Sequence, residues 1–342
     1  MLAGLQCGRA VAAVMVAIFH ANVFLLPSKF YAGEGAGAAF NFGYAGVEFF
    51  FVLSGFIMVL VHRRDFGQPS KALVFMRKRV VRIYPIYWLV MAFLLAIYFV
   101  SPGRGPDHAR DPLAILQSLL LIPSEDGPIM QVAWTLQHEM LFYIIFSGII
   151  LNLRIGRIVF GAWMLACVLA LPWSHDMSFP LSFLLKPHNL LFLFGIVAAY
   201  AYTHLSRSSA LLAFWTGCAL FLGIGLSETV LGVMGPESLQ PLGYGLGALL
   251  IVIGLAQGGL PAPRWLTFIG DASYAIYLVH LPVMNIAAVG LLASGLHLVL
   301  PPLAMLALIT VIVTVAGALV HVFAEKPLMK YFKNRSPRQA AA

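Results

Sequence analysis

Runs of about 20 predominantly apolar residues recur along the whole chain, and this repetition limits the possible folds more than any other feature. Hydrophobic residues make up 61% of the sequence and charged residues 10%. Soluble domains average about 25% charged residues, so a single globular core could not hide this much apolar surface. The sequence therefore predicts an all-α polytopic membrane protein.

The apolar runs predict ten membrane-spanning helices. They cover roughly residues 6–26, 44–62, 83–101, 132–153, 157–173, 188–204, 210–226, 238–257, 267–294 and 301–323. The apolar stretch Pro112–Ile122 is too short to span, so it is predicted to lie at the interface or to re-enter the membrane. Residues 1–330 are predicted to form one transmembrane domain, followed by a short basic cytoplasmic tail at 331–342. No internal repeat is visible, although an inverted-repeat transporter would often show one.

The distribution of Lys and Arg predicts that both termini face the cytoplasm. With the N-terminus inside, sixteen of the 21 Lys and Arg residues fall in inner segments, four fall in outer segments, and Arg9 lies at the inner end of the first span. This asymmetry accounts for the net charge of +8 without a nucleic-acid partner. The odd, scattered set of Cys7, Cys167 and Cys218 indicates neither a disulfide framework nor a metal site.

Four ionisable residues within the predicted spans stand out: His20, Glu48, Glu139 and His280. Such groups cost about 2.5–3.5 kcal/mol in hydrocarbon, so each is a candidate functional residue. His20 follows Arg9 by about 16 Å along a helix, which places it near the middle of the bilayer and on the same helix face. The other three fall between that depth and the outer third, which predicts one polar chamber. Taken singly, each is also compatible with a helix–helix hydrogen bond or with contact to interfacial water.

The segment FMRKRVVRIYPIYW (Phe75–Trp88) is densely basic. Arg79 and Arg82 would share one face of a helix, and Pro85 would fit the first turn of the third span. Because guanidinium groups bind phosphates with two parallel hydrogen bonds, this face is a candidate phosphate site. The alternative is that these arginines only anchor the inner end of the span, beside an interfacial belt of aromatic residues.

Five segments together resemble the acyltransferase-3 family of integral membrane O-acyltransferases. They occur in the family's order, on the first, second, third, fourth and ninth spans: LQCGRAVAAVMVAIFH, GVEFFFVLSGFIM, RKRVVRIYPIYW, WTLQHEMLFY and GDASYAIYLVHLPV. The EKP at Glu325–Pro327 is similar to the family's ending, and HEMLFY is most similar to members that decorate exopolysaccharides. The resemblance identifies residues 1–330 as an acyltransferase-3 type transmembrane domain.

The resemblance implies transfer of an acyl group, commonly acetyl from cytoplasmic acetyl-CoA, to a sugar hydroxyl. The acceptor would be a surface polysaccharide, an exopolysaccharide or its lipid-linked precursor. His20 is the expected general base, with Glu139 as the first and Glu48 as the second candidate for the carboxylate that orients it. The expected ligands of the CoA phosphates are Arg9, Arg79 and Arg82. The residues expected to contact the acceptor are Trp134, His138, Ser273, Tyr274 and His280.

The resemblance also implies the cytoplasmic (inner) membrane of a bacterium, with membrane lipids, a glycan acceptor and polysaccharide-biosynthesis proteins as candidate partners. The first motif departs from the family because Gln6 and Cys7 replace its usual Arg-Gly-type start, although the spacing from Arg9 to His20 is kept. Two other functions remain open on the residues alone. A proton-coupled transporter would also use His and Glu within the membrane, and a polysaccharide-export factor would need no catalytic residues.

Overall fold

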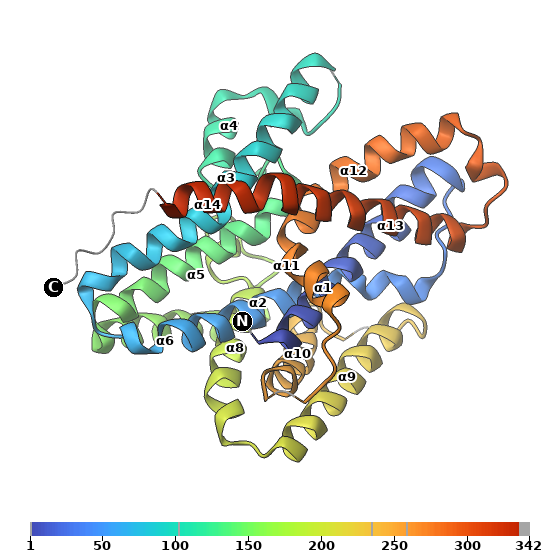
Figure 1. Cartoon of the computed structure of the whole chain (residues 1–342). Coiled ribbons are helices and arrows are strands. Elements are labelled where there is room, and N and C mark those ends of the chain that lie inside the picture. Colours follow the sequence, from blue (N-terminus) through green and yellow to red (C-terminus); the bar gives the residue numbers. More distant parts are fainter. Residues whose placement is uncertain (1, 102, 234, 258, 335–342) are drawn as a thin grey trace.

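The computed structural model describes residues 2–334 except residues 102, 234 and 258, and within these residues the regular structure is helical, without strands. Figure 1 shows helices that cross at several angles, with α1 near the centre of the molecule. The predicted all-α fold is confirmed. Residues 331–334 of the predicted tail belong to the last helix, α14, and residues 335–342 lie outside the described residues.

Within the described residues the α-helices are α1 Ala3–His20, α2 Gly46–His62, α3 Pro69–Val100, α4 Pro112–Leu119, α5 Trp134–Leu151, α6 Leu153–Ala170, α7 Leu181–Leu184, α8 Leu190–Ala201, α9 Arg207–Thr229, α10 Gln240–Gln257, α11 Arg264–Asp271, α12 Ser273–Ala293, α13 Pro302–Val320 and α14 Lys326–Asn334. The π-helical segments are η1 Ala21–Phe30 and η10 His321–Glu325. The 3-10 segments are η2 Ala38–Ala45, η3 Arg63–Asp65, η4 Asp107–Arg110, η5 Gln131–Ala133, η6 Leu171–Trp173, η7 Pro187–Asn189, η8 Tyr202–His204 and η9 Leu296–Leu298.

Ten helical stretches in the described part of the chain are long and apolar enough to cross a membrane. They are Ala3–Phe30, Ala38–Asp65, Pro69–Val100, Gln131–Leu151, Leu153–Trp173, Leu181–His204, Arg207–Thr229, Gln240–Gln257, Ser273–Ala293 and Pro302–Lys333. Each predicted span overlaps one of these stretches, in order. The chain is therefore a multi-pass membrane protein, as its composition predicts.

The third span differs most from its prediction. α3 begins at Pro69 and has 32 residues. At 1.5 Å per residue it is about 48 Å long, against about 30 Å of hydrocarbon, so its basic first half extends beyond the membrane. The prediction that Pro85 occupies the first turn is wrong, because Pro69 fills that place and Pro85 lies inside the helix. Since the basic segment is helical, Arg79 and Arg82 do share one helix face.

The predicted ninth span, 267–294, is two helices rather than one. α11 ends at Asp271 and α12 begins at Ser273, with Ala272 as the junction. α11 packs against α1, where Gln6 Nε2 donates a hydrogen bond of 2.6 Å to the Asp271 carboxylate. Only α12 is long enough to cross the membrane. α4, by contrast, has eight residues and agrees with the short segment predicted at Pro112–Ile122.

α1 is the helix around which the others are arranged. It packs against α2, α10, α11, α12 and α13. Its buried alanines allow these neighbours to approach closely; they are Ala10, Ala12, Ala13 and Ala17. Directly after His20 the chain continues as the π-helical segment η1, and such segments are frequent at functional sites. The polar residues of α1 therefore face neighbouring helices: Gln6 contacts α11, and Arg9 and His20 contact α12.

α2 and α8 touch through two glycines. A Cβ placed on Gly195 would lie 1.9 Å from the carbonyl oxygen of Val52, and one placed on Gly55 would lie 2.1 Å from that of Phe192. No side chain fits at such distances, so the absence of a Cβ is what lets the two backbones meet. This contact fixes α2, and with it Glu48, relative to α8.

We predict that Gly195→Ala destabilises the protein by about 1–3 kcal/mol, because the backbone of α2 must move to admit the methyl group. Gly161→Ala on α6 is the matched control, since a Cβ there meets nothing within 4 Å. Thermal unfolding of both purified variants in one detergent, followed by size-exclusion chromatography, measures the effect. Equal melting temperatures for the two variants would contradict the close contact.

Candidate active site

One face of α1 lies against one face of α12, and both faces carry polar residues. Arg9 Nε donates a hydrogen bond of 3.1 Å to Ser273 Oγ. Further along, the ring centroids of His20 and His280 lie 4.8 Å apart. Eleven residues on α1 and seven on α12 each return to nearly the same side of a helix. The face that Arg9 and His20 share thus meets a face shared by two predicted acceptor residues.

The main chain holds His20 in one tautomer. Its Nδ1 lies 2.9 Å from the carbonyl oxygen of Val16. That oxygen can only accept a hydrogen bond, so Nδ1 carries the proton in the neutral ring and Nε2 bears a lone pair. His280 is held alike, with Nδ1 2.6 Å from the carbonyl oxygen of Tyr277, and its buried Nε2 has no partner among the described residues. Each imidazole is therefore able to accept a proton at Nε2.

A cavity of about 190 Å³, here named the histidine cavity, opens beside His20. The residues that line it are Val16, Phe19, His20, Tyr44, Val47, Glu48, Gln131, Val132, Trp134, His188 and Tyr277. They come from α1, η2, α2, η5, α5, η7 and α12, so segments far apart in the sequence build it. Its walls include two predicted catalytic residues, His20 and Glu48, and one predicted acceptor residue, Trp134.

Glu48 supplies the carboxylate of the histidine cavity. It is 2% exposed, with Oε1 3.6 Å from Nε2 of His188, and Oε2 has no hydrogen-bond partner among the described residues. The Lys186 ammonium lies 4.4 Å from the ring centroid of Trp134 and within electrostatic range of Glu48. An under-bonded carboxylate in so apolar a setting is costly unless cationic groups or a ligand compensate it.

Glu139 lies elsewhere, although the sequence favoured it as the partner of His20. Its Oε1 accepts hydrogen bonds from Ser54 Oγ at 3.1 Å and from the hydroxyl of Tyr143, and it does not line the histidine cavity. Glu139 follows Trp134, which does line that cavity, by five residues. Five residues correspond to about 7.5 Å along the helix and a turn of about 140°. Depth was therefore a poor guide, because rotation about α5 takes the carboxylate to another side.

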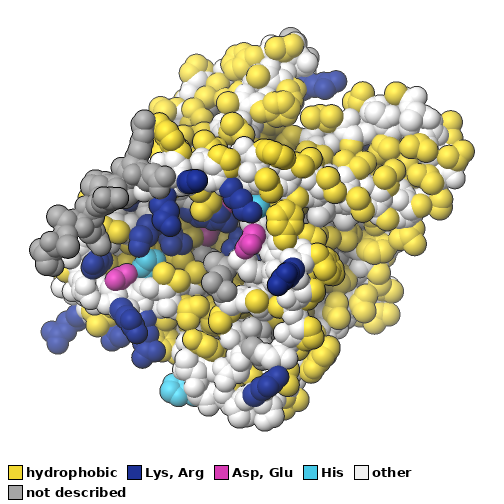
Figure 2. Space-filling view, viewed as in Figure 1, with side chains coloured by type: hydrophobic (Ala, Val, Ile, Leu, Met, Phe, Trp, Pro, Cys, Tyr) yellow, Lys and Arg dark blue, Asp and Glu magenta, His cyan; other side chains and the backbone are white. Residues whose placement is uncertain are grey.

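The predicted phosphate-binding arginines gather near the N-terminal end of α1, on the side of Glu139. Arg9 lies within electrostatic range of Arg82, Glu139 and Glu325. Arg79 lies over the Tyr143 ring at 5.7 Å, and its buried Nε has no hydrogen-bond partner among the described residues. Figure 2 shows Lys and Arg side chains gathered around a hollow on the face where the N-terminal end of α1 and helix α14 lie. This surface, here named the basic face, includes Arg9, Arg79 and Arg82. The basic face and the histidine cavity thus lie toward opposite ends of α1.

The carboxylate of Glu325 partly neutralises the positive charge of Arg82. Its guanidinium lies 2.5 Å from Oε1 of Glu325, and it also lies over the Tyr274 ring at 5.4 Å. Glu325 is 1% exposed and receives a second hydrogen bond, of 2.6 Å, from Nδ1 of His321. The sequence indicates Glu325 only as the first residue of the EKP segment that resembles the family's ending. In the structure it orients one of the arginines.

Two predicted acceptor residues use their polar atoms to hold helices together. The Tyr274 hydroxyl donates to the carbonyl oxygen of Ile83 at 2.9 Å, which joins α12 to α3. His138 is 2% exposed, with Nδ1 2.9 Å from Oδ1 of Asn189 and its ring stacked on Phe183. Neither residue lines the histidine cavity. Both contacts are those of packing residues.

Sequence reasoning missed several residues of the histidine cavity, above all His188 and Tyr44. His188 and Lys186 flank Pro187 just before α8, at the start of a span, where polar residues are ordinary and carry no cost that would mark them. Tyr44 and Tyr277 resemble any other aromatic residue of a membrane bundle. Only the three-dimensional packing brings these side chains to His20.

Residues 2–321 match the family described as Acyltransferase domain. The chain belongs to the acyltransferase-3 family. Among curated relatives, it is 31% identical over 313 residues to the exopolysaccharide production protein ExoZ of Rhizobium meliloti strain 1021, covering 88% of this chain and 94% of ExoZ. It is 25% identical over 377 residues to the acyltransferase MdmB of Streptomyces mycarofaciens, covering 94% and 90% of the two chains. No solved structure matches the chain significantly.

Membership of the acyltransferase-3 family makes this protein a membrane acyltransferase, and the reaction it requires suits the cavity. An acyl transfer needs a group that takes a proton from the attacking hydroxyl and a site for the acyl donor. His20 has an Nε2 without a hydrogen-bond partner among the described residues, and the basic face has guanidinium groups. Among the described residues, no cluster of three or more His, Cys, Asp or Glu side chains is arranged to hold a metal ion.

Proposed function

We propose that this membrane acyltransferase moves an acyl group, typically acetyl, from cytoplasmic acyl-CoA to a sugar hydroxyl. The acceptor is a surface polysaccharide, an exopolysaccharide or its lipid-linked precursor. The observation that carries the proposal is the lone pair of His20 Nε2 beside a cavity, with Nδ1 bound to the main chain. The glycan acceptor is supported by the similarity to ExoZ, whose name refers to exopolysaccharide production.

In the proposed reaction the sugar hydroxyl oxygen attacks the thioester carbonyl carbon while its proton passes to Nε2 of His20. The tetrahedral intermediate collapses, the C–S bond breaks, and the CoA thiolate leaves. The imidazolium then returns its proton to the thiolate or to solvent, so protons and electrons balance. Glu48 lines the same cavity, so we assign to it, rather than to Glu139, the role of stabilising the imidazolium across the cavity.

On this proposal acyl-CoA binds with its phosphates on the basic face and its pantetheine arm directed along α1 toward His20. Arg79 has a buried Nε that no described residue engages, which suits it to a phosphate ligand. Arg9 and Arg82 would complete the site, with Glu325 and Ser273 orienting them. Among the predicted acceptor residues, Trp134 is retained because it lines the histidine cavity, and His280 because its ring lies against His20.

The proposed orientation places both termini in the cytoplasm of a bacterium and the protein in its inner membrane, among polysaccharide-biosynthesis proteins. It is supported by the excess of Lys and Arg in the segments that would then be inside. The basic face would meet cytoplasmic acyl-CoA, and the histidine cavity would open toward the outer half of the bilayer.

We expect a fluorescent protein fused after Ala342 to be fluorescent, because that fusion would remain in the cytoplasm. Alkaline phosphatase inserted between α9 and α10, near Pro236, should be active, because that loop would be periplasmic. Measuring both activities in whole cells checks the orientation. The reverse pattern, phosphatase activity at Ala342 and none near Pro236, would overturn it.

We predict that Arg79→Ala raises the KM for acyl-CoA by about ten- to hundredfold, the worth of a hydrogen bond to a charged group. Arg79→Lys should also weaken binding, because an ammonium cannot form two parallel bonds to a phosphate. Arg64→Ala, which removes one exposed positive charge in the segment that precedes α3, is the control. If all three variants kept the wild-type KM, the arginines would serve only as membrane anchors.

We predict that His20→Ala inserts and folds but loses about 10²–10⁴-fold in acyl transfer, the usual contribution of a general base. His20→Gln should fail equally, because an amide donates and accepts hydrogen bonds but takes no proton. The wild-type rate should fall on acidification as the imidazole becomes protonated. Glu48→Gln should reduce the rate more than Glu139→Gln.

The matched control for His20 is His204→Ala, at an exposed histidine in η8. Acyl transfer is measured in membrane vesicles from the amount of labelled acyl group on the glycan, normalised to the amount of folded protein. A well-folded His20→Ala variant that transferred acyl groups near the wild-type rate would leave His20 as a packing residue.

A further inference from the structure

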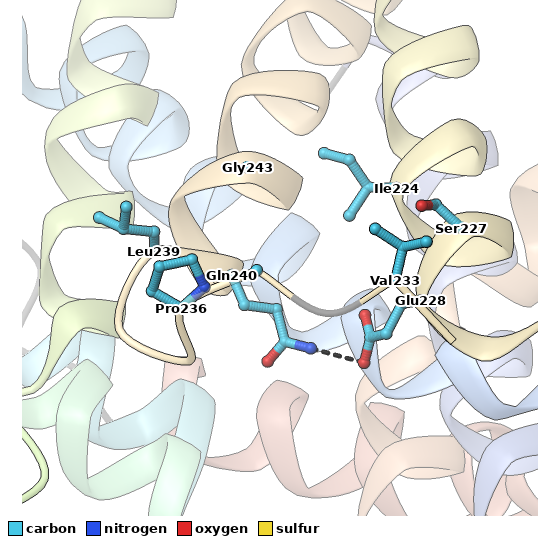
Figure 3. A pocket seen from close by; sticks show the side chains of 9 residues that line it. Ile224, Ser227, Glu228, Val233, Pro236, Leu239, Gln240 and Gly243 are labelled. Carbon is cyan, nitrogen blue, oxygen red and sulfur yellow. Dashed lines mark hydrogen bonds between the residues drawn. The ribbon is translucent and has the colours of Figure 1, made fainter. Parts of the chain in front are cut away.

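A second cavity, of about 260 Å³, lies between the end of α9 and the start of α10 and is here named the outer cavity. Ile224 and Leu239 form part of its aliphatic wall, and Ser227, Glu228 and Gln240 supply polar groups (Figure 3). Because successive spans alternate in direction, α9 ends and α10 begins on the same side of the membrane as the start of α2. The outer cavity therefore lies at the end of the bundle where Glu48 also lies.

Glu228 is held by neutral donors rather than by a cation. The Tyr44 and Tyr244 hydroxyls donate to its oxygens at 2.7–2.8 Å. Gln240 Nε2 donates to Oε1 at 2.5 Å, the bond drawn in Figure 3. A carboxylate has about four lone-pair positions, and three donors fill three of them. One position therefore remains for a ligand hydroxyl, and the described residues include no cation in an ion pair with Glu228.

Other polar atoms of the outer cavity are also free. The second N–H of the Gln240 amide donates to the Tyr44 hydroxyl at 2.7 Å, so its nitrogen is fully used. Its carbonyl oxygen has no hydrogen-bond partner among the described residues, and neither does the Ser227 hydroxyl. The cavity thus offers two acceptors and one hydroxyl above an aliphatic wall.

Tyr44 links the outer cavity to the histidine cavity. Its ring lines the histidine cavity beside Phe19, with ring centroids 5.5 Å apart. Its hydroxyl binds Glu228 and Gln240, which line the outer cavity. Tyr44 therefore lies between the two cavities: it forms part of the wall of one and binds two residues that line the other.

We propose that the outer cavity is an acceptor subsite, which holds a neutral sugar unit next to the one acylated at His20. The inference rests on the proposed function. A neutral sugar combines hydroxyls, for the free oxygens of Glu228, Gln240 and Ser227, with C–H faces for the aliphatic wall. A phosphate or an acidic sugar is disfavoured, because it would meet the negative charge of Glu228 without a compensating cation.

The test compares acceptors of two lengths with purified protein. The probes are oligosaccharides made from the host's own exopolysaccharide by partial hydrolysis and removal of acyl groups, and the monosaccharides of that polymer. With an outer subsite, the wild-type kcat/KM is higher for the oligosaccharides. Ser227→Leu, which fills the cavity, should lower the oligosaccharide kcat/KM about tenfold, the worth of one or two hydrogen bonds, and leave the monosaccharide value unchanged.

Thr229→Leu is the control, because Thr229 lies on the same last turn of α9 but does not line the outer cavity. Glu228→Gln keeps the size of the side chain and removes its charge. Like Ser227→Leu, it should lower the kcat/KM for the oligosaccharides. The subsite is overturned if wild type shows no length preference, or if Ser227→Leu impairs both acceptors equally or behaves like Thr229→Leu. In those cases acyl transfer to sugar itself persists, whereas transfer to neither acceptor by wild type would refute the proposed function as well.

Discussion

The fold depends on one constraint: each ionisable side chain inside the apolar bundle must find a partner within the protein or remain neutral. α1 meets this constraint at Arg9 and at His20. Arg9 donates to Ser273, and His20 donates through Nδ1 to its own main chain at Val16. Because the second bond stays within α1, it satisfies one ring nitrogen and leaves the other available. The lone pair on Nε2 of His20 is thus a consequence of how the membrane helix accommodates an imidazole.

Sequence predicted the spans well because their signal, the length of an apolar run, is set by the bilayer. It failed where a helix boundary has another cause. Pro69, a helix-starting proline in a polar segment, begins α3, and the junction at Ala272 divides a segment that the sequence predicts as one span. The length of an apolar run carries no information on either of these helix boundaries.

The same distinction applies to the candidate site. The cost of burying charge singled out His20 and Glu48, and the structure brings both to one cavity. It also singled out Glu139, whose depth is similar but whose direction is set by the rotation of α5. His188 and Tyr44 carry no such cost and are recognisable only from packing. Sequence therefore identifies which side chains are exceptional, whereas the crossing of helices decides which of them meet.

The imidazole of His20 lacks a carboxylate at Nδ1, and the proposed chemistry explains why a backbone carbonyl suffices. In peptide cleavage the leaving amine needs a proton from a strongly stabilised imidazolium, which the third member of a triad supports. A thioester releases a thiol, whose pKa of about 8.5 lies far below that of a sugar hydroxyl, so the leaving group departs as an anion without help. The base has then only to assist the attacking hydroxyl, and a neutral imidazole near physiological pH is suited to that single task. On the proposed mechanism, a histidine fixed by its own helix, with Glu48 lining the same cavity, is sufficient for this step.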